Sequence, residues 1–200
     1  MIGVIDYSAG NITSVSNALD AAGADFTVSS SREVLERADG LILPGVGGAP
    51  GAMESLHEEN LASFLSGPTV PLLGICLGMQ LLFESSEEGD TPCLSLLPGR
   101  VVRLDDSAAK VPHMGWNEVD FIPGNPLFEG IPPHSCFYFA HSFIAAGDAC
   151  VLGTTDCGRR FPSAVARGSV FGVQFHPEKS GSNGLRILKN FAGLCRSSRP

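Results

Sequence analysis

Apolar residues in the first half of the chain alternate between the continuous runs of buried strands and the three-to-four-residue spacing of helices. Strand-like runs cover 1–5, 26–28, 41–43 and 70–73, and helical spacing is found over 12–22, 34–38 and 53–64. Ser30 and Glu33 form a candidate capping box before the second of these helices. This alternation predicts a mostly parallel sheet whose loops gather at the carboxyl edge of the strands.

Shorter apolar segments, separated by Pro and Gly turns, occupy the second half of the chain, at 101–104, 137–139, 150–152 and 163–166. We expect them to be antiparallel additions to the sheet. A final helix is predicted after residues 180–183 by an apolar stripe at Leu185, Leu188, Phe191 and Leu194. No linker divides the 200 residues. The prediction is one domain over residues 1–200, a three-layer, doubly wound α/β fold with a mostly parallel sheet and antiparallel additions.

The amino-acid composition of the chain argues against several classes of function. Hydrophobic residues make up 44% and charged residues 17% of the chain, which is typical of a globular protein. The net charge of −8 argues against electrostatic binding to nucleic acid or to an anionic membrane surface. No apolar stretch approaches the roughly 20 residues that span a bilayer. The six cysteines lack zinc-ligand spacing and no basic secretory segment opens the chain, so we expect a cytoplasmic, reducing setting and no metal site.

The segment Gly74-Ile75-Cys76-Leu77-Gly78 has the pattern of a nucleophile elbow, in which a strand delivers a nucleophile to the start of a helix. Small residues are needed on both sides because the nucleophile occupies a strained turn with a crowded backbone. Backbone N–H groups at a helix start also favour the negative charge of a thiolate. Cys76 is therefore the candidate nucleophile.

A candidate base lies in the strand-like run that ends in His176-Pro177-Glu178. Residues two apart on an extended segment point to the same side, so Glu178 can lie beside His176. A carboxylate sets the tautomer of a histidine and stabilises its imidazolium, which leaves the other ring nitrogen to exchange protons with a thiol. Together the two segments predict a triad of Cys76, His176 and Glu178.

A glycine-rich loop follows the third predicted strand, over residues 43–48. Backbone N–H groups of such a loop can turn toward an anion, so Val46 and Gly47 could form an oxyanion hole together with the N–H of Leu77. In isolation this loop would be interpreted as an ordinary turn. A phosphate-binding loop is excluded because no Gly-Lys-Ser/Thr continuation follows.

The elbow and the His-Pro-Glu segment resemble the class I (triad) glutamine amidotransferases. Within that superfamily the chain is similar to the glutaminase subunits of imidazole glycerol phosphate synthase. The similar segments run from Asp6 to Ser180 and cover 6–11, 44–47, 81–89, 112–117, 138–142 and 174–180. Pro112-His113-Met114-Gly115-Trp116-Asn117 and the loop 44–47 point to this particular member.

The resemblance implies an enzyme that hydrolyses L-glutamine and passes the ammonia to a separate (β/α)8-barrel cyclase subunit, as one half of a heterodimer. The step forms imidazole glycerol phosphate and AICAR in histidine biosynthesis, and the glutaminase half needs no cofactor. Cys76 would attack the carboxamide, and His176 would first protonate the ammonia and then activate water. The remaining implied roles are recognition of the substrate's amino-acid end by Gln80, Glu88 and the backbone near His141, Ser142 and Phe143, and contact with the cyclase by Trp116, Asn117 and Tyr138.

Regulation by the partner is a further hypothesis: glycines on both sides of Val46 permit a peptide flip, so the loop would be misoriented for the oxyanion until the cyclase binds. Three alternatives stay open. One is an amidotransferase subunit of anthranilate or guanine nucleotide synthesis, which the segment 112–117 disfavours. The others are a γ-glutamyl hydrolase or cysteine peptidase on the same fold, and a silent regulatory subunit, which the intact triad disfavours. The chain departs from the family pattern at Ser8-Ala9 and at Cys157, where Tyr is common.

Overall fold

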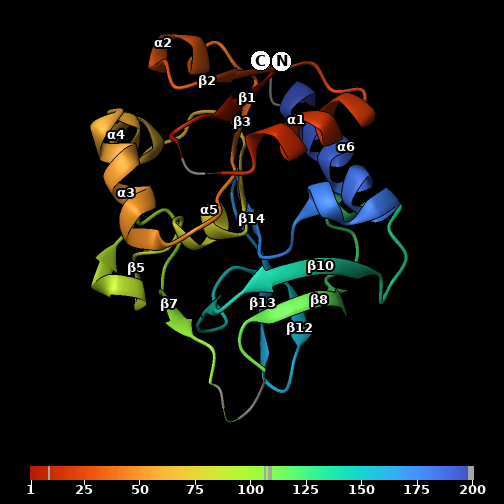
Figure 1. Ribbon diagram of the computed structural model, residues 1–200. Helices are drawn as coiled ribbons and strands as arrows, with labels where there is room; N and C mark the ends of the chain where they lie inside the picture. The colour runs from red at the N-terminus through yellow and green to blue at the C-terminus, as the bar shows by residue number, and fades with distance from the viewer. Residues whose placement is uncertain (9, 106, 108–109, 198–200) are drawn as a thin grey trace.

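An eight-stranded sheet forms the middle of the computed structural model, which describes residues 1–8, 10–105, 107 and 110–197 (Figure 1). The strand order is β2-β1-β3-β4-β14-β13-β12-β9. Neighbours from β2 to β14 are parallel, and β13, β12 and β9 continue the sheet in antiparallel order. The strands are β1 (Ile2–Ile5), β2 (Phe26–Ser29), β3 (Gly40–Leu43), β4 (Leu72–Ile75), β9 (Asp120–Phe121), β12 (Val151–Asp156), β13 (Arg160–Arg167) and β14 (Val170–Val173).

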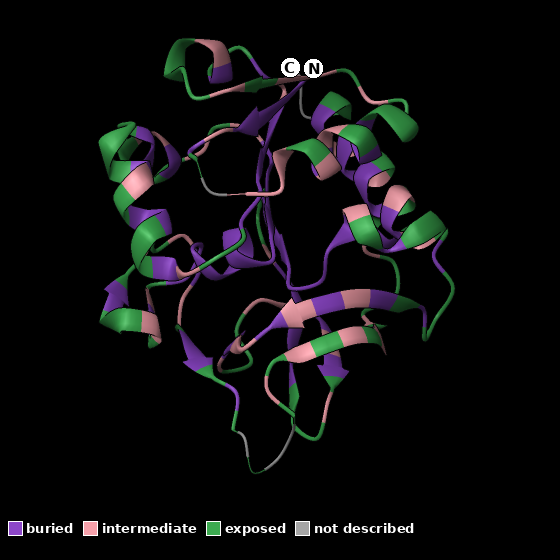
Figure 2. Cartoon of the chain, viewed as in Figure 1, coloured by how far each residue is buried: buried purple, intermediate pink, exposed green. Residues whose placement is uncertain are grey.

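Helices cover both faces of this sheet (Figure 1). One face carries α1 (Ile12–Ala21) and the C-terminal α6 (Gly181–Ser197), and the other carries α2 (Arg32–Leu35), α3 (Ala49–Glu58), α4 (Leu61–Leu65) and α5 (Leu77–Gln80). Two clusters of buried apolar side chains fill the spaces between the layers. The central strands β1, β3, β4 and β14 are buried along their length, and Figure 2 shows the middle of the sheet as buried. The predicted three-layer, doubly wound α/β fold is confirmed.

Two small sheets lie beside β12 and β13 of the main sheet. One pairs β10 (Cys136–His141) with β8 (His113–Glu118), and the other has the order β11 (Phe143–Ala145), β7 (Arg100–Arg103), β5 (Ser85–Ser86) and β6 (Thr91–Pro92). The prediction that segments 101–104 and 137–139 add to the main sheet is therefore wrong, although both form strands. An apolar run specifies a strand with a buried face, and the choice of partner strand depends on distant parts of the chain.

Helix boundaries also differ from the prediction in two places. The capping box at Ser30 and Glu33 is wrong, because α2 begins at Arg32 after Ser31 and no side chain caps it. The helical stretch over 53–64 is two helices, α3 and α4, because Asn60 between them has a left-handed backbone with φ +57°. Three short 3-10 turns complete the described elements, η1 (Glu88–Asp90), η2 (Pro126–Phe128) and η3 (Pro177–Lys179).

The carboxyl ends of β3, β4 and β14 meet at one edge, because these three strands are parallel neighbours. The glycine-rich loop follows β3, Cys76 follows β4, and His176 follows β14 after two further residues. Parallel pairing thus brings together three segments that are far apart in the sequence, at the edge where doubly wound folds place their sites.

Candidate active site

Cys76 occupies a strained turn between β4 and α5. Its backbone has φ +53° and ψ −109°, a region that a residue with a side chain adopts only under constraint. The strained elbow that the sequence predicts is therefore present. The helix behind it is a single turn of four residues, and none of its N–H groups makes a capping hydrogen bond to the Cys76 side chain. The Cys76 side chain is only 5% exposed.

The glycines of the elbow are required by close packing. A Cβ atom on Gly78 would lie 1.9 Å from the carbonyl oxygen of Leu43 on β3, and one on Gly74 would lie 2.6 Å from the carbonyl oxygen of Gly78. Neither backbone oxygen can move without separating the elbow from the sheet. The two glycines thus let the nucleophile turn pack directly onto the neighbouring strand.

His176 and Glu178 are in contact behind the nucleophile. Nδ1 of His176 lies 2.8 Å from Oε1 of Glu178, and their side chains are 3% and 1% exposed. Glu178 lies beside His176 as predicted, but the extended segment from which this was predicted is not present. The two residues are joined by the 3-10 turn η3 rather than by an extended segment. Because the carboxylate accepts from Nδ1–H, Nε2 of His176 is left to face the thiol.

The pKa of His176 is set by burial and by its two neighbours, Cys76 and Glu178. Burial lowers the pKa of His176, but hydrogen bonds to Cys76 and Glu178 and the negative charges of both groups outweigh burial and raise this pKa to about 10. These interactions hold the imidazole as an imidazolium at neutral pH. A thiolate beside an imidazolium is the reactive form of a cysteine nucleophile.

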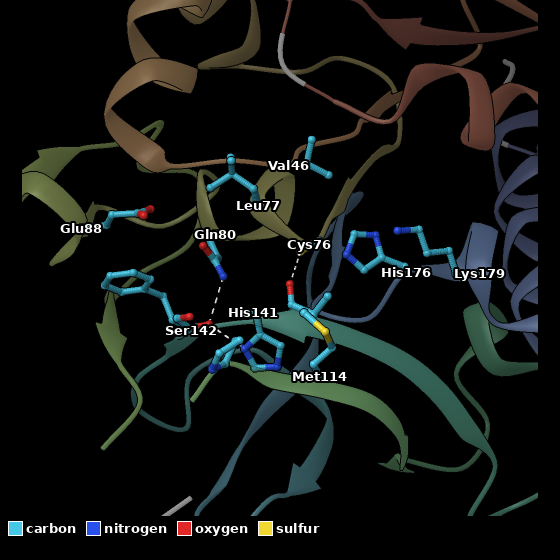
Figure 3. A pocket seen from close by; sticks show the side chains of 14 residues that line it. Val46, Cys76, Leu77, Gln80, Glu88, Met114, His141, Ser142, His176 and Lys179 are labelled. Atoms are coloured by element: carbon cyan, nitrogen blue, oxygen red, sulfur yellow. Dashed lines mark hydrogen bonds between the residues drawn. The ribbon is translucent and has the colours of Figure 1, made fainter. Parts of the chain in front are cut away.

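A pocket of about 340 Å³ opens over Cys76 (Figure 3). This volume is in the range of small-molecule sites. The pocket is lined by Val46, Gly47, Cys76, Leu77, Gln80, Glu88, Pro112, Met114, Ala140, His141, Ser142, Phe143, His176 and Lys179. The structure therefore brings together all the predicted oxyanion and substrate residues with Cys76 and His176. Glu178 lies behind His176 and does not line the pocket.

Sequence reasoning did not single out four of these lining residues. Met114 and Pro112 belong to the segment 112–117, which suggested only a partner contact, and Lys179 directly follows the His-Pro-Glu motif. Ala140 contributes its backbone carbonyl, which lies 3.9 Å from the Cys76 sulfur. No local pattern marks a backbone group of this kind, because its role depends on where β10 crosses the pocket.

Glu88 lies beside the glycine-rich loop. One carboxylate oxygen of Glu88 accepts a hydrogen bond of 2.7 Å from the backbone N–H of Ala49, at the first residue of α3. A carboxylate at a helix start is favoured by the helix dipole. The negative charge of Glu88 is thus held at the wall of the pocket, next to Gly48, where a cationic group of a ligand would meet it.

The predicted partner residues lie on the β10–β8 sheet, outside the pocket. Trp116 is 59% exposed and its ring contacts that of Tyr138 edge-to-face, with centroids 6.3 Å apart. Residues of β8 alternate in exposure, so Met114, Trp116 and Glu118 face outward. Asn117 faces the opposite way and donates a hydrogen bond of 2.8 Å to the carbonyl of Asp156. Asn117 therefore lies on the inward face of β8, behind the exposed Met114 and Trp116.

Of the residues that depart from the family pattern, Ser8 and Cys157 do not line the pocket over Cys76. Ser8 has a left-handed backbone, with φ +64°, and Ala9 lies outside the described residues. Cys157 is half-buried, in the turn after β12.

The described residues contain no group of three His, Cys, Asp or Glu side chains placed to hold a metal ion. Among those same residues, none of the helices combines the length and apolar content of a membrane span.

Comparison with known proteins defines the class of this site. The family model described as glutamine amidotransferase class-I matches residues 3–194. A crystal structure described as a glutamine amidotransferase has the same fold, with a TM-score of 0.77 and 20% identity, covering 98% of each chain. Fold and site together are those of a class I glutamine amidotransferase.

Curated relatives narrow the family further. Imidazole glycerol phosphate synthase subunit HisH of Bacillus cereus (strain B4264) is 50% identical over 202 residues, which cover 98% of this chain and 96% of that protein. HisH of Geobacillus kaustophilus is 48% identical over 206 residues, at 98% and 97% coverage. The chain belongs to the HisH family of imidazole glycerol phosphate synthase subunits within the class I glutamine amidotransferases.

Proposed function

We propose that this chain is the glutaminase subunit of an imidazole glycerol phosphate synthase, acting in histidine biosynthesis. The observation that carries the proposal is the pairing of a strained, pocket-lining Cys76 with the buried His176–Glu178 contact of 2.8 Å. Membership of the HisH family supports the pathway, because the matches to the HisH relatives cover 98% of this chain. The free state of all six cysteines within the described chain suits a reducing cytoplasm.

The reaction would proceed through a thioester. The Cys76 thiolate attacks the carboxamide carbon of glutamine, and the resulting oxyanion is held by backbone N–H groups of Leu77 and of the Val46–Gly47 loop. His176 donates its proton to the departing nitrogen as the C–N bond breaks, which releases ammonia. His176 then takes a proton from water, whose oxygen attacks the γ-glutamyl thioester. The C–S bond breaks, which releases glutamate and restores the Cys76 thiolate. Glu178 orients His176 through both steps.

The pocket suits a single amino acid. Glutamine has a compact polar end and a four-carbon reach to its carboxamide, and the pocket of about 340 Å³ carries charge at one wall and the nucleophile at another. The carboxylate of Glu88 would bind the α-ammonium group. Both amide hydrogens of Gln80 are engaged by protein oxygens, which leaves its Oε1 as an acceptor for the same ammonium.

Release of ammonia toward a partner is supported by the surface around the pocket. Met114 lines the pocket and is also 65% exposed, next to the exposed Trp116 on the same strand. Large apolar side chains that are exposed together favour a protein partner. We place the cyclase subunit on this surface, with Trp116 and Tyr138 as contacts, so that ammonia passes between subunits without entering bulk water. The loop 44–47 would adopt its oxyanion-binding orientation when that complex forms.

Glutamate release from glutamine tests the proposal. The full chain is assayed alone, with a histidine-pathway cyclase subunit, and with that subunit plus its ribonucleotide substrate. We expect strong stimulation in the last mixture and its abolition by Cys76→Ala. The matched control is Cys136→Ala, since Cys136 is exposed on β10 and outside the pocket. Stimulation that survives Cys76→Ala, or no glutamate in any mixture, would refute the proposal, and full activity of the chain alone would refute its gating part.

A further inference from the structure

One backbone oxygen beside the pocket orders a chain of polar side chains. The carbonyl oxygen of Phe143 lies 3.0 Å from Nε2 of Gln80 and 2.9 Å from Nδ1 of His141 (Figure 3). A carbonyl oxygen only accepts hydrogen bonds, and it has two lone pairs. Both nitrogens are therefore donors, and the oxygen is saturated. The donor direction of every further bond on either side follows from this point.

Toward the nucleophile, the chain of hydrogen bonds continues through two glutamines. Gln80 uses its second amide hydrogen to donate to Oε1 of Gln174, over 3.0 Å. Gln174 is fully buried, and its own amide nitrogen then faces the sulfur of Cys76 at 3.7 Å. Because Gln174 is held with its oxygen toward Gln80, it presents an N–H donor to the sulfur. A donor at a sulfur stabilises the thiolate over the thiol.

Away from the nucleophile, the chain of hydrogen bonds continues through two histidines. Nε2 of His141 lies 2.9 Å from Nδ1 of His113. Burial and the nearby charge of His113 lower the pKa of His141 to about 3, and burial also lowers that of His113. Both rings are therefore neutral at physiological pH. Since His141 carries its hydrogen on Nδ1, its Nε2 accepts, and Nδ1 of His113 must donate.

At the far end of this hydrogen-bond chain, Asn117 independently requires the same tautomer of His113. Asn117 donates from Nδ2 to the carbonyl of Asp156, and its Oδ1 accepts a 2.8 Å bond from the N–H of Glu118, so backbone groups fix its orientation. Its second amide hydrogen therefore points at Nε2 of His113, 3.2 Å away, which accepts. His113 is thus fixed as the Nδ1–H tautomer from both sides.

We propose that His113 is a positioning residue for glutamine hydrolysis, acting through His141, the Phe143 carbonyl and Gln80 to hold the Gln174 amide as a donor to the Cys76 sulfur. The inference rests on the proposed function for its catalytic meaning. His113 and Asn117 lie on the inward face of β8, whose outward face carries Met114 and Trp116. The hydrogen-bond chain therefore ties the donor at the nucleophile to the strand on which we place the cyclase.

Nitrogen-15 NMR of the imidazole rings in the unmodified chain is the first test, and substituted chains serve only to assign its signals. Both His113 and His141 should titrate below neutral pH and should be protonated at Nδ1 above it. Assignment rests on the His113→Asn and His141→Asn spectra. An Nε2–H tautomer for either ring, or an imidazolium at neutral pH, would overturn the proposal, because the hydrogen bonds that join His113 through His141 to the Phe143 carbonyl would then not form as described.

Substitution of His113 tests the effect on the nucleophile. His113→Leu removes the donor to His141, whereas His113→Asn carries an amide donor near the position of Nδ1. With His113→Leu, the pH profile for alkylation of Cys76 by iodoacetamide should move to higher pH, because the amide donor to the thiolate is held less firmly. The kcat should fall about tenfold with little change in KM, and His113→Asn should restore most of both.

The matched control is His134→Leu, because His134 is exposed and its Nδ1 lies 3.5 Å from Glu118 on the same strand without joining the chain. An unshifted alkylation profile in His113→Leu, or an equal shift in His134→Leu or His113→Asn, would refute the positioning role. Alkylation and tautomers are measured without glutamine. A chain that passes both tests but does not hydrolyse glutamine would therefore refute the proposed function and leave the hydrogen-bond chain intact.

Discussion

Glu178→Gln removes the charge that orients the candidate base while keeping its shape. The amide oxygen can still accept from Nδ1 of His176, but the negative charge is lost. The second carboxylate oxygen of Glu178 is buried and is the one such side-chain atom in the described chain that has no hydrogen-bond partner. In the variant an amide group with two hydrogens would occupy that site, also without a partner, so the substitution gains no compensating bond.

The size of the effect follows from the bond that is weakened. A hydrogen bond to a charged group contributes about 1.5–3 kcal/mol, and a neutral one about 1 kcal/mol or less. Loss of the charge, a difference of about 0.5–2 kcal/mol, should therefore lower kcat/KM by about 2- to 30-fold, at 1.4 kcal/mol for each factor of ten. Because Glu178 is one of the two groups that raise the pKa of His176 to about 10, that pKa should fall in the variant.

The sign of the pH effect distinguishes this explanation from a simple loss of structure. The imidazolium is present below the pKa of His176 and is lost as pH rises through it, so activity should decline at a lower alkaline pH in the variant than in the unmodified enzyme. The measurement is kcat/KM for glutamine against pH, from neutral to strongly alkaline, in the presence of the cyclase subunit. Glu54→Gln, on the exposed side of α3, is the control. An alkaline limb at the same pH in both enzymes would refute the reasoning.

Three further predictions concern the elbow, the loop and the pocket. Gly78→Ala would place a Cβ 1.9 Å from the Leu43 carbonyl oxygen and should lower the free energy of unfolding by about 3 kcal/mol or more, measured by urea denaturation. Tyr7→Phe removes the 2.7 Å hydrogen bond to the Pro44 carbonyl and should cost about 1 kcal/mol in the same assay, with a lower kcat because the loop loses an anchor. Glu88→Gln should raise KM for glutamine about tenfold, measured from initial rates, because the charge opposite the α-ammonium is lost.

Each of these predictions has a specific contrary result. An unfolding free energy for Gly78→Ala within about 1 kcal/mol of the unmodified value would mean that the elbow is not packed as tightly as described. Wild-type stability and kcat in Tyr7→Phe would show that the Pro44 carbonyl needs no partner. An unchanged KM in Glu88→Gln, or the same rise in Glu54→Gln, would remove Glu88 from substrate recognition.

The first half of the fold was predictable because its signals are local. Continuous apolar runs predicted β1, β3 and β4, and helical spacing predicted α1, since each pattern depends only on which faces of the element are buried. The partner of a strand is a different matter. Segments 101–104 and 137–139 are strands as expected, but they pair outside the main sheet, and a strand's own residues contain little information about that choice.

The candidate site divides in the same way. Cys76 and the His176–Glu178 pair are marked by short motifs, because a strained elbow needs its glycines and a histidine needs a nearby carboxylate. Gln174 and His113 are not marked in this way. Their importance arises from hydrogen bonds between residues that lie far apart in the chain, such as the 98 positions between Gln174 and Cys76.

The sequence by itself determined the candidate triad of Cys76, His176 and Glu178 and the β/α order of the elements that carry it. Local geometry decides these features, through backbone strain at the elbow and the burial pattern of each element. Only the tertiary structure decided which strands became neighbours, which lining residues complete the pocket, and how a single carbonyl at Phe143 orders the donors on both sides of it. Those outcomes depend on contacts between distant segments, and hydrogen-bond direction is set only once both partners are in place.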